Sequence, residues 1–193
     1  MRSLEQALRT RRVALCAPDL RSIHLLYQTI RDLGLESFIE VSNNGKKVPK
    51  EILRSKHQVA LFACWLAHQL ERSTKMTVGI DVGARNIGMV ILINDIMAYT
   101  SIVRENDKTI ELISELIKLK KDIQCKIGYT KACYKLAEEL AGSIRKLRVS
   151  ANLVHEEEAK ANVVIGDFTR LKKLSRHELD ALRIALSPTG CTI

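Results

Sequence analysis

Acidic side chains and a histidine stand at the ends of apolar segments in the second half of the chain. Asp81 ends the segment "TVGID", Glu156 and Glu157 follow "ANLVH", and His177 and Asp180 lie in "RHELDALRIAL". The i, i+3 spacing of His177 and Asp180 places both on one face of a helix. Hard oxygen ligands from several elements suit Mg²⁺ or Mn²⁺. Two such ions, about 3.5–4 Å apart, can drive phosphodiester hydrolysis.

Each of these groups also has a structural interpretation when it is taken alone. An Asp at a strand end is often a turn former, and acids at the start of a helix interact favourably with the helix dipole. The joint appearance of the acids in this order favours a shared site. In an open α/β sheet, functional groups gather at the carboxyl ends of the strands.

The hydrophobic pattern of the second half predicts a mixed α/β sheet. Three strands in a meander come first, at 77–81, 87–94 and 95–104. Strands and helices then alternate, with strands at 123–130 and 150–158 and helices at 107–121, 131–147, 157–166 and 175–187. Such an order implies parallel strands with crossover helices after the meander.

The first 75 residues predict a separate small α/β unit. The short apolar run 13–17 is a strand, and Asp19 can cap the helix that ends at Gly34. The segment "FIEV" is a second strand, "SNNGKK" is a loop by composition, and residues 49–72 have a helical pattern. A small α/β unit therefore precedes the mixed sheet.

The chain is basic, with a formal net charge of +9 and a pI of about 9.4. Residues 1–75 hold 13 Lys and Arg against 7 Asp and Glu, and residues 76–193 hold 18 against 15. We expect two domains with these boundaries. A basic surface favours nucleic acid as a partner, and evenly spread charges are the alternative. Aromatic residues make up only 4%, so stacking on aromatic rings is not expected to dominate recognition.

Other features bear on location and redox state. The longest apolar stretch, residues 58–70, is too short to span a bilayer, and residues 1–12 do not resemble a signal peptide. We expect no membrane association and a cytoplasmic location. The five cysteines include no CxxC pair, which argues against a zinc knuckle and a secreted disulfide framework. The basic, aromatic-poor composition favours an archaeal source.

Three motifs carry a resemblance to a known family. The segment "GIDVGARNIGMVIL" resembles the first-strand motif of the RuvC-like branch of the ribonuclease H-like superfamily, which includes Holliday junction resolvases and YqgF-type proteins. The segment "RHELDALRIAL" is similar to the helix that ends that family. The segments "IGYT" and "ANLVHEEEAKAN" resemble the YqgF variant. The resemblance covers roughly residues 76–187.

The resemblance implies a ribonuclease H-like fold with a metal site. It places His177 and Asp180 at the two C-terminal metal positions and Glu156 on an acidic position of the YqgF pattern. Resolvases of the RuvC type also carry a Glu at the end of the fourth strand, where this chain has Gly128 and Tyr129. Either Glu156 or Glu157 supplies the missing carboxylate, or the metal site is incomplete.

Basic residues beside these motifs are the expected contacts to phosphate. Gly83 and Gly88 would let backbone or a phosphate come close to the turn after Asp81. The predicted nucleic-acid contacts are Arg85, Lys172, Lys173 and Arg176. For the segment that holds Lys172 and Lys173, a solvated basic turn is the alternative interpretation.

The sequence thus predicts a Mg²⁺- or Mn²⁺-dependent nuclease that acts on structured DNA or RNA, such as a branched junction. Symmetric cleavage of a junction would require a homodimer. The alternative is a non-catalytic nucleic-acid-binding protein that keeps the fold with an incomplete metal site. The actin and sugar-kinase branch also begins with G-I-D-x-G, but it needs two such domains and a second glycine motif, which 193 residues do not supply.

Overall fold

The computed structural model describes residues 1–71, 75–119, 122–163 and 174–188. Its internal contacts divide the chain into two compact units. The first comprises Met1–Ser73 with Asp95–Ala98, and the second comprises Thr74–Asn94 with Tyr99–Ile193. In the described part of the chain, no helix is long and apolar enough to cross a membrane.

The first unit is a small α/β structure. It contains β1 (Arg2–Ser3), α1 (Leu4–Leu8), β2 (Val13–Cys16), α2 (Leu20–Asp32), β3 (Ile39–Val41), β4 (Lys46–Lys47), α3 (Lys50–Leu53) and α4 (Gln58–Leu70). Its parallel sheet has the order β3-β2-β4 and contributes Leu15 and Ile39 to the core. Asp19 caps α2 by accepting a hydrogen bond from the backbone N–H of Ser22 at 2.8 Å, and Gly34 follows the helix with a φ of 65°.

Two elements of the first unit differ from the sequence-based expectation. Lys46 and Lys47 of the predicted loop form the edge strand β4 beside β2. The helix predicted over 49–72 is two helices, because the chain turns between Leu53 and Gln58. The hydroxyl of Ser55 accepts a hydrogen bond from the backbone N–H of His57 at 3.0 Å. Such a side-chain contact competes with the helical backbone ladder.

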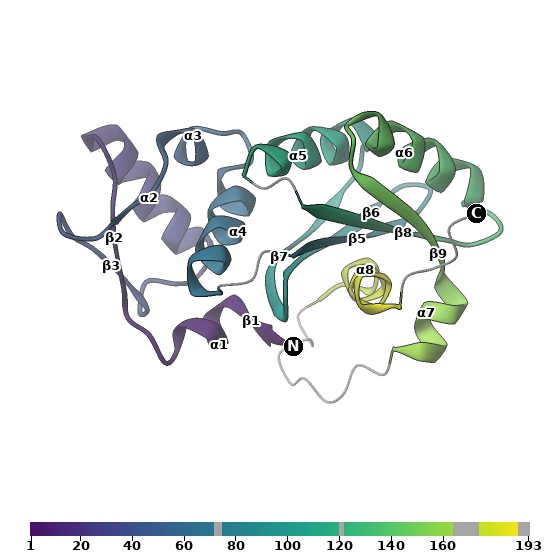
Figure 1. Cartoon of the computed structure of the whole chain (residues 1–193), viewed down its shortest axis with the longest axis horizontal. Coiled ribbons are helices and arrows are strands. Elements are labelled where there is room, and N and C mark those ends of the chain that lie inside the picture. Colours follow the sequence, from purple (N-terminus) through teal and green to yellow (C-terminus); the bar gives the residue numbers. More distant parts are fainter. Residues whose placement is uncertain (72–74, 120–121, 164–173, 189–193) are drawn as a thin grey trace. The chain divides into compact units, whose positions relative to one another are not determined.

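The second unit is a mixed sheet with helices on both faces (Figure 1). Its elements are β5 (Met76–Val82), β6 (Ile87–Ile93), β7 (Ile96–Val103), α5 (Asn106–Leu119), β8 (Ile123–Tyr129), α6 (Tyr134–Lys146), β9 (Ser150–His155), α7 (Glu156–Asn162) and α8 (Arg176–Leu186), with the first three residues of β7 belonging to the first unit. The strand order is β7-β6-β5-β8-β9, and β1 pairs with the first residues of β7. The predicted meander followed by parallel strands is confirmed.

The pairing of the central strands determines which residues lie beside Asp81 in the sheet. Strand β5 pairs antiparallel with β6 and parallel with β8, so Asp81 lies opposite Gly88 on one side and Gly128 on the other. All residues of β5 and β6 are buried. Helices α5 and α6 lie on one face of the sheet and α8 on the other (Figure 1). Because β5, β8 and β9 are parallel neighbours, their carboxyl ends lie at the same edge of the sheet, and α8 covers the adjacent face.

Candidate functional site

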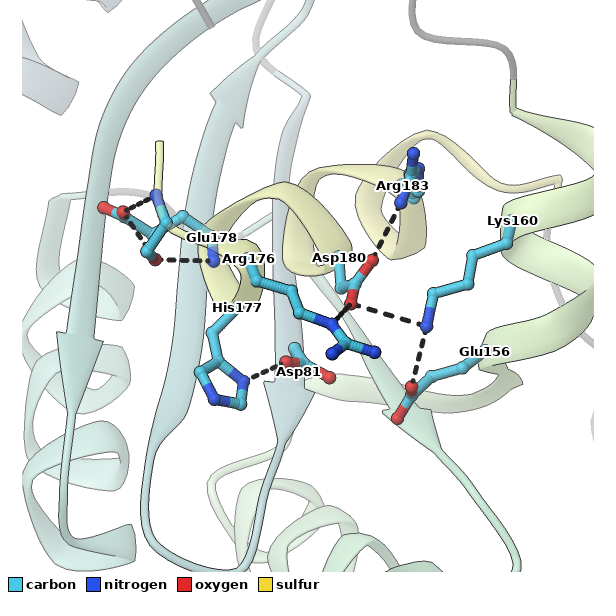
Figure 2. Close-up of polar contacts among 9 residues, drawn as sticks. Asp81, Glu156, Lys160, Arg176, His177, Glu178, Asp180 and Arg183 are labelled. Atoms are coloured by element: carbon cyan, nitrogen blue, oxygen red, sulfur yellow. Dashed lines mark hydrogen bonds and ion pairs between the residues drawn. The ribbon is translucent and has the colours of Figure 1, made fainter. Parts of the chain in front are cut away.

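Asp81 lies near the end of β5, beneath the first turn of α8 (Figure 2). It is 4% exposed, and its Oδ2 lies 2.7 Å from Nδ1 of His177. Burial raises the pKa of Asp81, the hydrogen bond with His177 acts against this, and the nearby Asp180 raises the pKa further. A buried carboxylate with a raised pKa is typical of functional sites.

Helix α8 supplies His177 and Asp180 from one face. Its N-cap, Ser175, accepts a hydrogen bond from the backbone N–H of Glu178, whose carboxylate accepts one from the backbone N–H of Ser175 at 2.9 Å. This capping box fixes where the helix begins. Asp180 is 5% exposed. The cap thus determines which residues of α8 face the sheet.

Glycines in the sheet let α8 lie directly on its backbone. A Cβ atom at Gly88 would lie 2.2 Å from the carbonyl oxygen of His177, and one at Gly79 would lie 2.2 Å from that of Ala181. Of the two partners expected near Gly88, backbone or phosphate, the structure places backbone there. This close approach brings His177 and Asp180 to the end of β5.

Glu156 lies beside Gly128, near the end of β8, where the strand itself carries no acid. A Cβ atom at Gly128 would lie 3.3 Å from Cγ of Glu156 and 2.1 Å from Cδ1 of Ile184. Glu156 begins α7 and is 8% exposed, whereas Glu157 is exposed. Successive helical residues point about 100° apart, so only one of the two can face the sheet. Of the two predicted carboxylates, the structure brings Glu156 to the site.

Two cations that the sequence interpretation missed hold these carboxylates. Nζ of Lys160 lies 3.4 Å from Oε2 of Glu156 and 3.4 Å from Oδ2 of Asp180. Nη1 of Arg183 lies 2.9 Å from Oδ1 of Asp180 (Figure 2). Their spacings from Glu156 (i, i+4) and Asp180 (i, i+3) are signals that the sequence offered.

The three carboxylates, His177 and Lys160 line one cavity of about 170 Å³, and Arg183 lies outside its lining. Its lining residues are Asp81, Val82, Gly83, Thr130, Cys133, Glu156, Lys160, Arg176, His177 and Asp180. Burial raises the pKa of Glu156, and the charge of Asp81 adds to this. Burial in this cavity therefore disfavours the charged forms of both Asp81 and Glu156.

The side chains of the cavity differ in how well their types and their spacing suit a divalent ion. Across residues 1–71, 75–119, 122–163 and 174–188, no three His, Cys, Asp or Glu side chains lie close enough together to hold a metal. Three carboxylates and an imidazole in one cavity nevertheless have the chemistry that Mg²⁺ or Mn²⁺ requires. The ammonium of Lys160 lies between Glu156 and Asp180, 3.4 Å from a carboxylate oxygen of each.

The residues predicted to contact phosphate differ in where they lie relative to the cavity. Arg176 lines the cavity with a side chain that is 88% exposed, and its Nε lies 4.0 Å from Oδ2 of Asp180. Arg85 is exposed in the turn between β5 and β6. Lys172 and Lys173 lie outside the described residues.

Comparison with known proteins found similar solved structures only. No family model matches the chain, and no curated protein matches it. A structure titled "T. thermophilus RuvC in complex with Holliday junction substrate" is 12% identical, with a TM-score of 0.45 over 57% of this chain and 90% of that chain. A structure of the Aquifex aeolicus PPX-GPPA enzyme is 18% identical, with a TM-score of 0.27 over 44% of this chain and 37% of that chain.

Proposed function

We propose that this protein is a divalent-metal-dependent nuclease that acts on structured nucleic acid. The observation that carries the proposal is the convergence of Asp81, Glu156 and Asp180 on one cavity from β5, α7 and α8. Burying three carboxylates together is costly unless cations compensate them. Because this cost is borne at the carboxyl ends of the strands, the three carboxylates are expected to form a functional site and not only to support the fold.

The side chains divide into holding, orienting and substrate-contacting groups. Asp81, Glu156 and Asp180 would hold the ion, and His177 fixes the orientation of the Asp81 carboxylate through its 2.7 Å contact. A bound Mg²⁺ or Mn²⁺ would supply activation of water and neutralisation of charge on the leaving oxygen. The exposed guanidinium of Arg176 at the cavity would contact a backbone phosphate.

The charge of the chain supports a polyanionic substrate. A net charge of +9 favours contacts between Lys or Arg side chains and phosphates, which carry no sequence information. The affinity for nucleic acid should therefore fall as the salt concentration rises. The sequence resemblance to junction resolvases makes a four-way junction one of the substrates to test.

A second candidate function is a nucleic-acid-binding protein without catalysis. The position of Lys160 between Glu156 and Asp180 favours it, because that ammonium already satisfies two of the carboxylates. The glycine at the end of β8 removes the fourth-strand acid of the resolvase pattern. The two candidates differ in whether the cavity takes up a metal.

The deciding experiment incubates a labelled four-way junction, a duplex and a structured RNA with the protein in Mn²⁺ or in EDTA. Asp81→Asn removes a charge from the cavity, and Asp32→Asn removes one from the exposed end of α2 as a matched control. We expect Mn²⁺-dependent cleavage by the wild type and by Asp32→Asn only. Salt-sensitive binding without cleavage in any metal would overturn the nuclease and support the second candidate.

A further inference from the structure

Lys160 lies between two carboxylates that come from different helices. Its Nζ is 3.4 Å from both Oε2 of Glu156, on α7, and Oδ2 of Asp180, on α8. Figure 2 shows the ammonium at the end of an extended stem between these two oxygens. A divalent ion held by Glu156 and Asp180 would compete with this ammonium for the two carboxylates.

Among the side chains that the structure describes, three cations lie near Asp180; Nε of Arg176 is 4.0 Å from Oδ2, and the two nearer cations contact different oxygens. Arg183 contacts Oδ1 at 2.9 Å, and Lys160 contacts Oδ2 at 3.4 Å. Charge-assisted hydrogen bonds are strongest at about 2.7–2.9 Å, so the contact with Arg183 is the tighter one. Arg183 can therefore keep Asp180 in place while Oδ2 exchanges its partner.

The side chain of Lys160 can also leave the cavity. It is 37% exposed, whereas those of Glu156 and Asp180 are 10% and 7% exposed. Lysine is a point charge on a flexible four-carbon stem, so its ammonium can move into water without backbone motion. The carboxylates lack this freedom, because they are buried at helix positions fixed against the sheet.

We infer that Lys160 is a built-in counter-ion of the metal-free site, which holds Glu156 and Asp180 together and must leave when a divalent ion binds. The inference rests on the proposed function. Lys160 is thus a positioning residue that keeps the cavity folded without metal and lowers its affinity for metal. Without the ammonium, the carboxylates would repel each other and attract a cation more strongly.

The test is direct Mn²⁺ binding, measured by electron paramagnetic resonance of free Mn²⁺ and by calorimetry, with no nucleic acid present. Lys160→Met keeps the length of the stem and removes the charge, and Lys160→Arg keeps the charge. Lys118→Met is the matched control, because Lys118 is an exposed lysine of the same unit paired with Glu115. Circular dichroism and thermal melting in EDTA establish that each variant is folded.

We expect Lys160→Met to bind Mn²⁺ roughly tenfold more tightly than the wild type, because two partly exposed ion pairs no longer compete. Lys160→Arg and Lys118→Met should bind as the wild type does. Lys160→Met should also melt at a lower temperature in EDTA and recover in Mn²⁺. If only Lys160→Met bound Mn²⁺ tightly, the inference would also be supported. The wild type would then fit the second candidate function, a nucleic-acid-binding protein without catalysis.

Two outcomes would overturn the inference, and they differ in what they mean for the nuclease. Equal Mn²⁺ affinity of wild type and Lys160→Met, together with metal-dependent cleavage, would leave the proposed function and reject the role of Lys160. No Mn²⁺ binding by any folded variant would reject both.

Discussion

The imidazole Nδ1 of His177 lies 2.7 Å from Oδ2 of Asp81, although 96 residues separate them in the chain. The contact joins the first turn of α8 to the end of β5. It can form because the residue of β6 that faces the carbonyl of His177 is a glycine, Gly88. The side chain of His177 is 38% exposed, so the pair lies at the border between the cavity and solvent.

Replacing His177 with alanine should weaken both Mn²⁺ binding and cleavage by about 10–100-fold, as loss of an orienting partner of a metal ligand typically does. The physical reason is that the Asp81 carboxylate loses the group that fixes its orientation. His24→Ala, at an exposed position of α2, is the control and should change neither quantity. Unchanged Mn²⁺ affinity in His177→Ala would show that the contact is structural only.

Replacing Gly88 with alanine should destabilise the protein by at least about 2 kcal/mol, because the new methyl group would overpack against the backbone of α8. Gly142→Ala is the control. A Cβ at Gly142 has nothing within 4 Å, and this residue lies inside α6, so the substitution should stabilise by about 0.5–1 kcal/mol. Urea unfolding measures both. Equal stability of the two variants would contradict the close approach of α8.

Replacing Glu156 with glutamine should stabilise the metal-free protein at pH 7.5 by about 1 kcal/mol, a rise of roughly 2–4 °C in Tm. Burial raises the pKa of Glu156 above its ordinary value of 4.5. The folded state then binds more protons than the unfolded state in the window above 4.5, so stability falls as pH rises through it.

The pH dependence supplies the check on this prediction. The advantage of Glu156→Gln should shrink as the pH falls toward 4.5, because protonation of Glu156 removes the same buried charge that the substitution removes. Glu157→Gln, at the exposed neighbour, should stay within about 0.5 kcal/mol of the wild type at every pH. A Glu156→Gln variant that melts below the wild type at pH 7.5 would show that the contact with Lys160 outweighs the cost of burial.

Replacing Lys126 with methionine should destabilise the protein by about 1–3 kcal/mol. Lys126 is 7% exposed in β8, and its Nζ donates to the carbonyl of Ala185 at 3.0 Å and to that of Ser187. These carbonyls end α8 and would lose their partner. The cost of charging is visible in the pKa of Lys126, which burial lowers and the charge of Lys75 lowers further.

The matched control for Lys126→Met is Lys118→Met, which removes an exposed ion pair and should cost less than about 1 kcal/mol. Urea unfolding separates the two variants. If Lys126→Met were as stable as the control, relief from burying the charge would have offset the lost hydrogen bonds to α8.

The sequence by itself determined the order of elements in the second unit and the side chains that gather at its open end. Continuous apolar runs mark strands that are buried on both faces, such as β5 and β6, and apolar residues with a period of 3.6 mark helices, which is why the meander and α8 were predictable. A strand that ends in Asp81 and a helix with His177 and Asp180 at i, i+3 predict groups on one side of the sheet.

Only the tertiary structure decided which charges meet. The choice of Glu156 over Glu157 depends on where α7 begins and on the space above Gly128, which is a property of packing. The pairing of Lys160 with Asp180 depends on α7 and α8 lying side by side, and no local pattern encodes a contact between helices. Sequence periodicity shows which face a residue occupies, whereas long-range packing determines its partner there.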